Sequence, residues 1–595
     1  MCGINGFNFI NKPLLKQMNY SIAHRGPDAE GSFFDKNISL GHRRLAIIDL
    51  SQNGAQPMTY IHKKNKVTIT FNGEIYNFQE IKEELVKLGY KFKSNSDTEI
   101  ILASYLEWGK DCVKKFNGMW AFCIYDPQKQ ILFLSRDRVG KKPLYYYFDK
   151  NKFIFSSEIK GILKHKIKFE LNKDAIDLYF SLGFIPAPYS IYKNINKLEQ
   201  RQSLIYNLKT NNLEKEYYYE WPNYNPQKKN FKQEFYNLIK DSTKLRMISD
   251  VPLGAFLSGG LDSSTIVNFA QMFNKNINTY SIGFEGKYDE TPYINITKNH
   301  FKTNHHHKYY TEKDFKNQLK EIFYYFDEPF SDSSMFPTEF LTKFAREELT
   351  VSLSGDGGDE VFGGYPRYKY ALQLTILRKM PKSIRKLLMF IPYSKLKEGL
   401  KLSLLSKESF YSEARTDFFK PQITREILEK RLKKCLEKTN NDLIQAVRLM
   451  DIEFYTLPDN FLTKVDRASM ANAMEIRCPF LDYRLIELSM QSPSKNIVSM
   501  FNEKNLFREI IKDFLPSRII NKKKQGFTPP INDWITKPEY KKELEKSLEE
   551  LKEILPKEWI QFYPAKIFPT NSLVHNNYKI RLYLFYRWYK YWNKN

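Results

Sequence analysis

The 595-residue sequence is poor in the features that mark secreted, membrane and metal–thiolate proteins. Its five cysteines are scattered and show neither a disulfide framework nor a metal-ligand spacing, which fits a reducing cytosol. No apolar run approaches the roughly 20 residues that a membrane-spanning helix needs. Polar Asn5, Asn8 and Asn11 interrupt the start of the chain, so no signal peptide is predicted. We therefore expect a cytoplasmic protein with no membrane partner.

The sequence also lacks a long block of one charge, although it is strongly basic. Lys and Arg number 93 against 68 Asp and Glu, a net charge of +25, and the excess is spread along the chain. A nucleic-acid-binding protein is expected to concentrate such charge in a patch or stripe. We interpret the excess as a solvated basic surface with no nucleic-acid partner. The alternative predicts retention on DNA with a steep dependence on salt.

The hydrophobic content of 42% and the aromatic content of 15% suit a globular protein, and the length predicts two or more domains. Strand patterns at 67–71, 120–125, 131–134 and 153–155, with amphipathic helices at 78–88 and 98–108, predict stacked α+β layers. A polar, aromatic stretch follows near 207–229. Strands then alternate with helices up to about 360, and the rest is nearly all helical. We predict domains over 2–208 and 230–595.

The stretch from Val251 to Ser264 predicts an anion site. An apolar run at 251–257 indicates a strand, glycines break it, and a helix is expected at 263–273. Backbone N–H groups and the dipole at a helix N-terminus favour phosphate. No Lys follows the glycines, so this is not a Walker-type loop. Asp262 suits a divalent cation that accompanies phosphates. A plain Gly-rich turn is the alternative.

A second segment repeats this pattern. A strand is predicted at 350–353, and Ser354-Gly355-Asp356-Gly357-Gly358-Asp359-Glu360 follows it directly. Two such strands suit one crevice at the carboxyl ends of a parallel sheet. The glycine loop resembles the pyrophosphate-binding loop of ATP-pyrophosphatases, which release AMP and pyrophosphate.

Cys2 is the candidate nucleophile at the start of the chain. A small second residue lets the initiator Met be removed, which would place the Cys2 thiol beside its own α-amino group. That amine has a reference pKa of about 7.7–8.0 and a thiol about 8.5, so the neutral amine can accept the thiol proton. A cysteine at position 2 would be weak evidence alone.

Several motifs accompany Cys2: His24-Arg25-Gly26-Pro27-Asp28, the run from Gly41 to Asp49, Phe71-Asn72-Gly73-Glu74-Ile75-Tyr76-Asn77 and Ser96-Asp97-Thr98-Glu99. Together they resemble the class II glutamine amidotransferase domain, an N-terminal-nucleophile (Ntn) hydrolase with an αββα sandwich. The resemblance implies that Cys2 attacks glutamine, and that the Asn72 amide and the Gly73 N–H stabilise the oxyanion. Arg44 would bind the substrate carboxylate, and Asp97, with Glu74, the ammonium. The implied glutamine-binding set is Arg44, Leu45, Ala46, Ile47, Ile48, Asn72, Gly73, Glu74 and Asp97.

The chain from Cys2 to about Trp534 resembles the glutamine-hydrolysing asparagine synthetase family. Further motifs carry this resemblance: Tyr280 to Phe284, Phe326 to Phe330 with Asp332-Ser333-Ser334, Lys464 to Met470, Arg477 to Asp482 and Lys524 to Phe527. It implies an α/β ATP-pyrophosphatase domain, of the adenine nucleotide α-hydrolase-like class, with a helical C-terminal part. ATP would contact Leu257, Ser258, Gly259, Gly260, Asp262, Ser263, Ser264, Ile282, Ser354 and Gly355. Asp262 and Asp359 would hold Mg²⁺, and Asp356, Asp359 and Lys524 would serve acyl-adenylate formation. A plain surface lysine is the alternative for Lys524.

The predicted activity is therefore the ATP-dependent synthesis of asparagine from aspartate, with glutamine as the source of ammonia. Its intermediates would be a Cys2 thioester and β-aspartyl-AMP. The same chemistry on another carboxylate, such as a sugar acid of a surface polysaccharide, is the alternative. A non-catalytic binding protein on this scaffold is a further one, which the intact Cys2, Asp97, Asp262 and Asp359 oppose. The resemblance also allows a homodimer.

The tract His305-His306-His307 has two interpretations. A metal site would need a nearby cysteine or carboxylate spacing, which is absent. We predict a polar strand edge.

Overall fold

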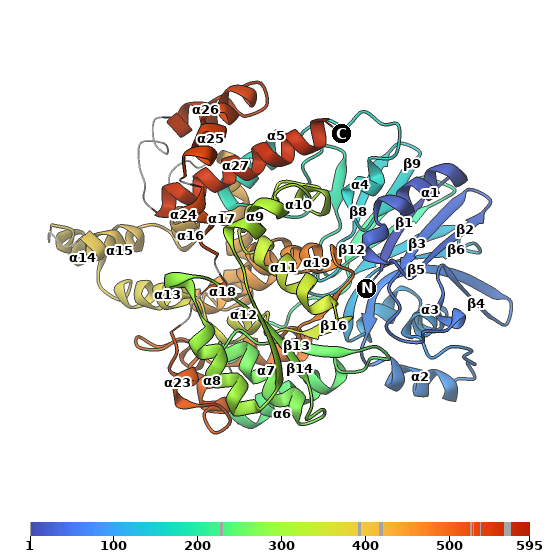
Figure 1. The fold of residues 1–595 in the computed structure, drawn as a ribbon, viewed down its shortest axis with the longest axis horizontal. Coiled ribbons are helices and arrows are strands. Elements are labelled where there is room, and N and C mark those ends of the chain that lie inside the picture. Colours follow the sequence, from blue (N-terminus) through green and yellow to red (C-terminus); the bar gives the residue numbers. More distant parts are fainter. Residues whose placement is uncertain are drawn as a thin grey trace.

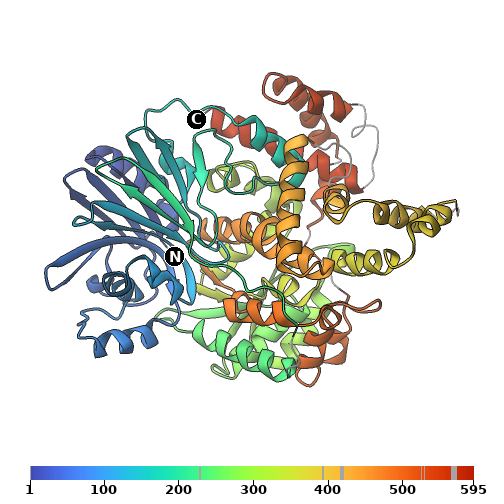
Figure 2. The same cartoon turned by 180° about the vertical axis from the view of Figure 1, so that it is seen from behind.

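The computed structural model describes residues 2–226, 230–390, 394–415, 421–523, 526–527, 529–535, 537–564 and 573–594. Two regions lie side by side: an N-terminal region of strands, blue to cyan in Figure 1, and a mainly helical region that contains a third sheet. Figure 2 shows the same division from behind. None of the helices in the described residues is long and apolar enough to cross a membrane.

The N-terminal region contains two six-stranded antiparallel sheets. In spatial order, the first sheet comprises β10 (Ile195–Lys197), β8 (Tyr145–Asp149), β9 (Lys152–Ser156), β1 (Gly3–Phe7), β3 (Ile38–Arg44) and β2 (Ala29–Asp35). The second comprises β12 (Leu213–Tyr217), β11 (Gln202–Asn207), β7 (Ile131–Arg136), β6 (Gly118–Asp126), β5 (Asn65–Ile75) and β4 (Met58–His62). Strand β12 pairs with β11, so the second sheet continues past residue 208, where the sequence predicted the first domain to end.

These two sheets form an αββα sandwich. Helices α1 (Lys12–Ser21) and α4 (Ile159–Ile162) cover the first sheet, and α2 (Phe78–Lys87) and α3 (Asp97–Trp108) cover the second. A buried apolar cluster that includes Ile4, Leu40 and Leu204 joins the facing sides of the two sheets. A second cluster, which includes Ile69 and Ile101, seals the second sheet against its helices. The predicted sandwich and both predicted helices are therefore confirmed.

The third sheet is parallel and lies in the helical region. Its order is β15 (Asn304–Tyr309), β14 (Asn278–Gly283), β13 (Leu253–Phe256), β16 (Val351–Leu353) and β17 (Glu475–Arg477). Helices α6 (Phe231–Leu245), α7 (Leu261–Gln271), α8 (Thr291–Phe301) and α11 (Met335–Arg346) flank it. Strands β13 and β16 are neighbours in this parallel sheet, so the two loops that were predicted to share one crevice follow adjacent strands. The three histidines lie on β15 at the sheet edge, which confirms that prediction.

The remaining helices build up the rest of the helical region around this sheet. They are α5 (Lys173–Leu182), α9 (Glu312–Gln318), α10 (Ile322–Tyr325), α12 (Gly358–Phe362), α13 (Pro366–Leu377), α14 (Lys382–Leu388), α15 (Ser394–Leu404), α16 (Lys407–Arg415), α17 (Gln422–Lys438), α18 (Leu443–Met450), α19 (Leu462–Met470), α20 (Tyr483–Gln491), α21 (Ser494–Ile497), α22 (Asn505–Ile511), α23 (Ser517–Ile520), α24 (Ile531–Trp534), α25 (Pro538–Glu550), α26 (Lys557–Phe562) and α27 (Leu573–Lys594). Helices α14 and α15 project from the body (Figure 1). The sequence predicted helices beyond residue 360 but did not predict β17, because three residues are too few to show a strand period.

Apolar and ionic contacts join the two regions. Leu45, Ile47 and Met119 pack with Val351 and Met470 in one buried cluster that draws on both regions. The fully buried Arg25 binds Asp466 on α19 through two hydrogen bonds of 2.8 and 3.0 Å. Because breaking a buried pair leaves an uncompensated charge, such contacts fix how the two regions sit against each other.

Candidate functional site

Cys2 lies directly before β1 at the border between the two regions. It is buried, and burial raises the pKa of its thiol, whose Sγ is 3.9 Å from the Leu45 carbonyl. Its backbone N donates to Asn72 Oδ1 at 3.0 Å, and Arg25 Nε donates to its carbonyl at 3.1 Å. A thiol with a raised pKa needs a nearby base to become a nucleophile.

Asn72 and Gly73 lie on β5 beside this cysteine. The Asn72 Oδ1 accepts from Cys2, while its Nδ2 is buried without a hydrogen-bond partner among the described residues. A buried amide donor left unsatisfied costs about 1–3 kcal/mol. A Cβ on Gly73 would lie 2.1 Å from the Met119 carbonyl oxygen, so only glycine fits here. The strand thus holds an unpaired donor beside the thiol.

Arg44, the last residue of β3, is oriented by backbone carbonyls. Its Nη1 donates to Ser51 O at 2.9 Å and its Nη2 donates to Asp49 O. Each Nη carries two N–H bonds, so one from each remains for a ligand. Arg43 faces the other way and binds Glu30 at 3.0 Å, as alternation along a strand requires.

Two buried carboxylates, Glu74 and Asp97, line the same pocket. Asp97 begins α3 and accepts from the Ile75 N–H at 2.8 Å. Burial raises the pKa of Asp97 to about 6, and burial together with the charge of Asp97 raises the pKa of Glu74. Glu74 Oε1 has no hydrogen-bond partner among the described residues. Paired buried carboxylates of this kind favour a bound ammonium group.

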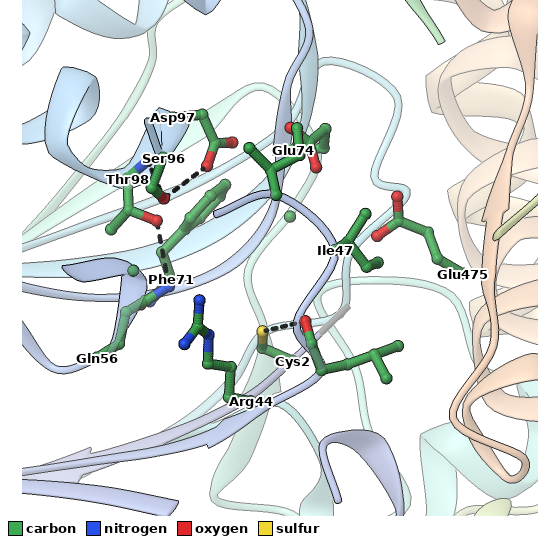
Figure 3. Close-up of a pocket in the computed structure, with 14 residues that line it drawn as sticks. Cys2, Arg44, Ile47, Gln56, Phe71, Glu74, Ser96, Asp97, Thr98 and Glu475 are labelled. Atoms are coloured by element: carbon green, nitrogen blue, oxygen red, sulfur yellow. Dashed lines mark hydrogen bonds between the residues drawn. The ribbon is translucent and has the colours of Figure 1, made fainter. Parts of the chain in front are cut away.

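The structure brings most of the predicted glutamine-binding residues into one small pocket, shown in Figure 3. Those that line it are Cys2, Arg44, Leu45, Ile47, Ile48, Gly73, Glu74 and Asp97. Asn72 lies next to Cys2 without lining the pocket, and the Ala46 N–H instead binds Asp28 at 2.8 Å. Sequence reasoning missed Gly54, Gln56 and Glu475 in the wall, and it quoted Ser96 and Thr98 only as part of a motif, without a role. Glu475 enters from β17 of the other region, which only the tertiary structure could reveal.

A larger cavity, of about 380 Å³, lies beyond the carboxyl ends of β13 and β16. The loop between β13 and α7 forms one wall, and Ser258 Oγ and Ser263 Oγ are 3.0 Å apart within it. The loop after β16 forms another, with Ser354 Oγ donating to Asp356 Oδ2 at 2.7 Å. A Cβ on Gly355 would lie 2.8 Å from the Ser263 nitrogen, so this glycine lets the two loops touch.

Lysines bind the acidic side chains of this cavity. Lys504 Nζ lies 2.6 Å from both carboxylate oxygens of Asp262 and 2.7 Å from Asp359 Oδ1. Lys522 Nζ lies 2.5 Å from Glu290 Oε1. Asp262 and Asp359 therefore converge on one cation position, and their hard oxygen ligands suit Mg²⁺, which commonly takes one or two carboxylates together with substrate phosphates. The described residues contain no cluster of three or more metal-ligating side chains.

The predicted nucleotide residues divide into two groups. Ser258, Gly260, Asp262, Ser263, Ser354, Gly355, Asp356 and Asp359 line the cavity. Leu257, Gly259, Ser264 and Ile282 do not. Leu257, just after β13, and Ile282, on β14, are buried, and the Gly259 carbonyl lies 3.4 Å from Lys522 Nζ. Lys524 lies outside the described residues.

Lys504 and Glu290 were missed because neither stands in a motif with a chemical signature. Lys464 and Val465 also line the cavity, within a stretch that the sequence singled out without assigning it a role. Arg25 did stand in a motif, but the sequence gave no role to its side chain. A charged side chain that neighbours a motif in space but not in sequence gives no local signal.

Comparisons with known proteins agree with this arrangement. Residues 1–219 match the glutamine amidotransferase domain family, and residues 234–567 match the asparagine synthase family. The chain is 48% identical to putative asparagine synthetase [glutamine-hydrolyzing] 2 of Methanocaldococcus jannaschii over 518 residues, 81% of this chain and 100% of the relative. It is 33% identical to asparagine synthetase [glutamine-hydrolyzing] 1 of Bacillus subtilis, over 88% of this chain and 84% of the relative. For asparagine synthetase [glutamine-hydrolyzing] 3 of that organism the identity is 31%, over 90% and 89%.

Proposed function

Because this chain belongs to the glutamine-hydrolysing asparagine synthetase family, we propose that it makes asparagine from aspartate, glutamine and ATP, with release of glutamate, AMP and pyrophosphate. One observation carries the proposal. A buried cysteine pocket with an unpaired amide donor and a cavity at the ends of two parallel strands occur in one chain, and an apolar cluster packs the two regions that carry them against each other.

Glutamine hydrolysis would occur in the first pocket. The α-amino group of Cys2, once Met1 is removed, accepts the thiol proton, and the thiolate attacks the amide carbon of glutamine. The Asn72 Nδ2 and the Gly73 N–H donate to the oxyanion. Collapse of the tetrahedral intermediate releases ammonia and leaves a thioester, which water hydrolyses to glutamate. Arg44 holds the substrate carboxylate, and Glu74 with Asp97 holds its ammonium group.

Activation of aspartate would occur in the second cavity. A side-chain carboxylate oxygen of aspartate attacks the α-phosphorus of ATP, pyrophosphate leaves, and β-aspartyl-AMP forms. Ser258 to Ser263 cradle the departing phosphates at the start of α7. Asp262 and Asp359 are the residues that would hold Mg²⁺, which when bound neutralises triphosphate charge. Lys504 contributes a further positive charge beside both carboxylates.

We propose that ammonia passes between the sites through the apolar cluster of Leu45, Ile47, Met119, Val351 and Met470. Leu45 and Ile47 line the glutamine pocket, and Val351 begins the strand that leads to Ser354. Apolar surroundings penalise ammonium relative to neutral ammonia, so such a path keeps the nucleophile unprotonated. Displacement of AMP by ammonia then gives the amide.

The test is an acceptor screen with the purified protein, Mg²⁺-ATP and glutamine or ammonium chloride. With aspartate as the acceptor, we expect asparagine, AMP and pyrophosphate in equal amounts from either nitrogen source, and glutamate only when glutamine is supplied, all measured by mass spectrometry. Amidation of a sugar acid in preference to aspartate would contradict the choice of acceptor. Release of ADP and phosphate would contradict the adenylation step.

We also propose a cytoplasmic location, because all five cysteines are free and buried, as a reducing compartment permits. The chain would divide into its glutamine and synthetase domains between β12 and α6.

A further inference from the structure

Helices α14 and α15 form a hairpin that projects from the body of the protein (Figure 1). Arg385 on α14 joins the two helices, because its Nη1 donates to Ser403 Oγ on α15 at 3.1 Å, and its Nε donates to the Met380 carbonyl at 3.1 Å. None of the described residues of the hairpin lines the glutamine pocket or the nucleotide cavity. The hairpin therefore has a defined structure that neither chemical step uses.

Helix α14 is amphipathic in the opposite sense to a helix that packs on a core. Its Arg385 is only 9% exposed, whereas Ile384, Leu387 and Phe390, just after the helix, are 46%, 69% and 86% exposed. Their spacing of three residues places these apolar side chains on one side of the helix, which we call the apolar ridge. A surface helix normally turns its apolar side inward. An outward apolar ridge that surrounds a buried arginine indicates a surface for a partner.

The hairpin is also strongly basic. Between residues 378 and 401 the sequence has eight basic residues against one acidic residue, Glu398. Five lysines in this segment are exposed and have no carboxylate partner among the described residues: Lys379, Lys382, Lys386, Lys397 and Lys401. The fold thus gathers at one projecting end a part of the positive charge that is spread along the sequence. A partner of complementary charge is anionic.

We propose that this hairpin docks the protein on an anionic lipid surface. Leu387 and Phe390 enter the headgroup layer, and the lysines bind lipid phosphates, as in amphipathic helices that lie at a membrane interface. Such a peripheral contact needs no membrane-spanning run, and it replaces the expectation from the sequence that the protein has no membrane partner. It is independent of the proposed function, because the hairpin belongs to neither cavity.

A lipid surface matches both properties of the hairpin, whereas other partners match only one. A nucleic acid offers phosphates to the lysines but no apolar layer to Ile384 and Leu387. A second copy of this chain that met the ridge with its own ridge would set lysines against lysines, and like charges oppose that contact. A headgroup layer supplies anions at its surface and apolar chains beneath them, and it can surround a projecting element.

The experiment is co-sedimentation of the full chain with vesicles. One set contains roughly seven parts phosphatidylcholine to three parts phosphatidylglycerol, a second set contains phosphatidylcholine alone, and each is used at about 50 and about 500 mM salt. Wild type is compared with Lys382→Glu/Lys386→Glu, which reverses the charge beside the ridge, and with Leu387→Ser/Phe390→Ser, which removes its apolar end.

Two matched controls carry the same kinds of change elsewhere on the surface. Lys433→Glu/Lys434→Glu reverses two exposed lysines of α17. Tyr20→Ser removes an aromatic side chain that is 78% exposed on α1. These controls separate docking through the hairpin from weak adsorption through the overall charge of +25.

Wild type is expected to sediment with the phosphatidylglycerol vesicles at low salt, and to lose most of this binding at high salt or without the anionic lipid. Each lysine near an anionic surface contributes roughly fivefold to binding, so Lys382→Glu/Lys386→Glu should weaken it by at least about tenfold. Leu387→Ser/Phe390→Ser should weaken it by about tenfold or more, because apolar burial is lost. Both controls should bind like wild type.

The proposal is overturned if wild type stays in the supernatant with phosphatidylglycerol vesicles at low salt, or if both hairpin variants bind them as tightly as wild type. Two further measurements identify another occupant, and either positive result also overturns the proposal. Retention on DNA that only Lys382→Glu/Lys386→Glu abolishes would assign the hairpin to nucleic acid. A dimer in light scattering that Leu387→Ser/Phe390→Ser dissociates would assign it to a second copy of the chain.

Discussion

The two pockets differ in whether the polar groups of their walls are paired with other side chains. In the glutamine pocket, the Asn72 Nδ2 and Glu74 Oε1 are buried with no partner among the described residues. In the nucleotide cavity, Asp262 and Asp359 are bound to Lys504, and Glu290 to Lys522. The first pocket therefore has unsatisfied polar atoms in its buried wall, while in the second these three carboxylates are paired with lysines.

The difference follows from the ligands that the two sites would take. Glutamine is small and carries no net charge, so a preformed pocket can match it group for group without rearrangement. A triphosphate carries several negative charges and binds together with a cation. Carboxylates without a paired positive charge would repel one another and the triphosphate. Predictions that act on one site and spare the other test this contrast.

The largest effect is expected from Cys2→Ala. Loss of the nucleophile should reduce glutamine hydrolysis by on the order of 10⁴–10⁶-fold, as for other catalytic nucleophiles. Synthesis from ammonium chloride should remain, because that reaction uses only the second cavity. Mass spectrometry of the wild-type protein should show a chain without Met1; fully active protein that retains Met1 would refute the amine as the base.

Asp262→Asn should have the next largest effect, at the other site. Loss of one carboxylate from the cation position should lower AMP and pyrophosphate release by about 10²–10³-fold, or roughly 3–4 kcal/mol. Glutamine hydrolysis without nucleotide should not change. Pyrophosphate release is the measurement, and equal loss of both activities would show that Asp262 supports the fold instead.

Arg44→Lys should raise the KM for glutamine by tens- to thousands-fold, since losing a charge-assisted partner costs about 2–5 kcal/mol. Lysine cannot bind the Ser51 and Asp49 carbonyls and still offer two parallel N–H groups. Arg43→Lys is the control and should change KM little, because Arg43 faces Glu30. Steady-state kinetics with glutamine and with ammonium chloride separate the two roles.

The smallest effect concerns pH. Burial raises the pKa of Asp97 to about 6, so Asp97 gains a proton as the pH falls below that value and loses its attraction for ammonium. The KM for glutamine should rise by about fourfold between pH 7.5 and 5.5, the ratio of ionised fractions. Asp97→Asn should show a high KM that no longer changes over this range. A pH-independent KM in wild type would show that Asp97 does not bind the ammonium group.

Much of the fold could be predicted from local patterns. Alternation at 67–71 and helical periodicity at 98–108 correspond to β5 and α3, and glycine breaks at Gly259 and Gly355 correspond to the two loops of the nucleotide cavity. The edge position of the histidine tract was also predictable from its polarity. These features depend on residues within a few positions of one another, where backbone sterics and burial act directly.

The sequence by itself predicted the chemical groups of both sites, because Cys2, Asn72 and Asp262 stand in motifs that resemble those of a known family. Only the tertiary structure decided which groups share a wall. Glu475 and Arg477 lie more than 400 positions from Glu74 in the chain, yet Arg477 Nη2 is 3.3 Å from Glu74 Oε2. Lys504, which directly precedes α22, bridges Asp262 and Asp359 from a distant part of the chain. Such contacts arise from the packing of one region on another, and long-range charge pairing leaves no periodic trace in the sequence.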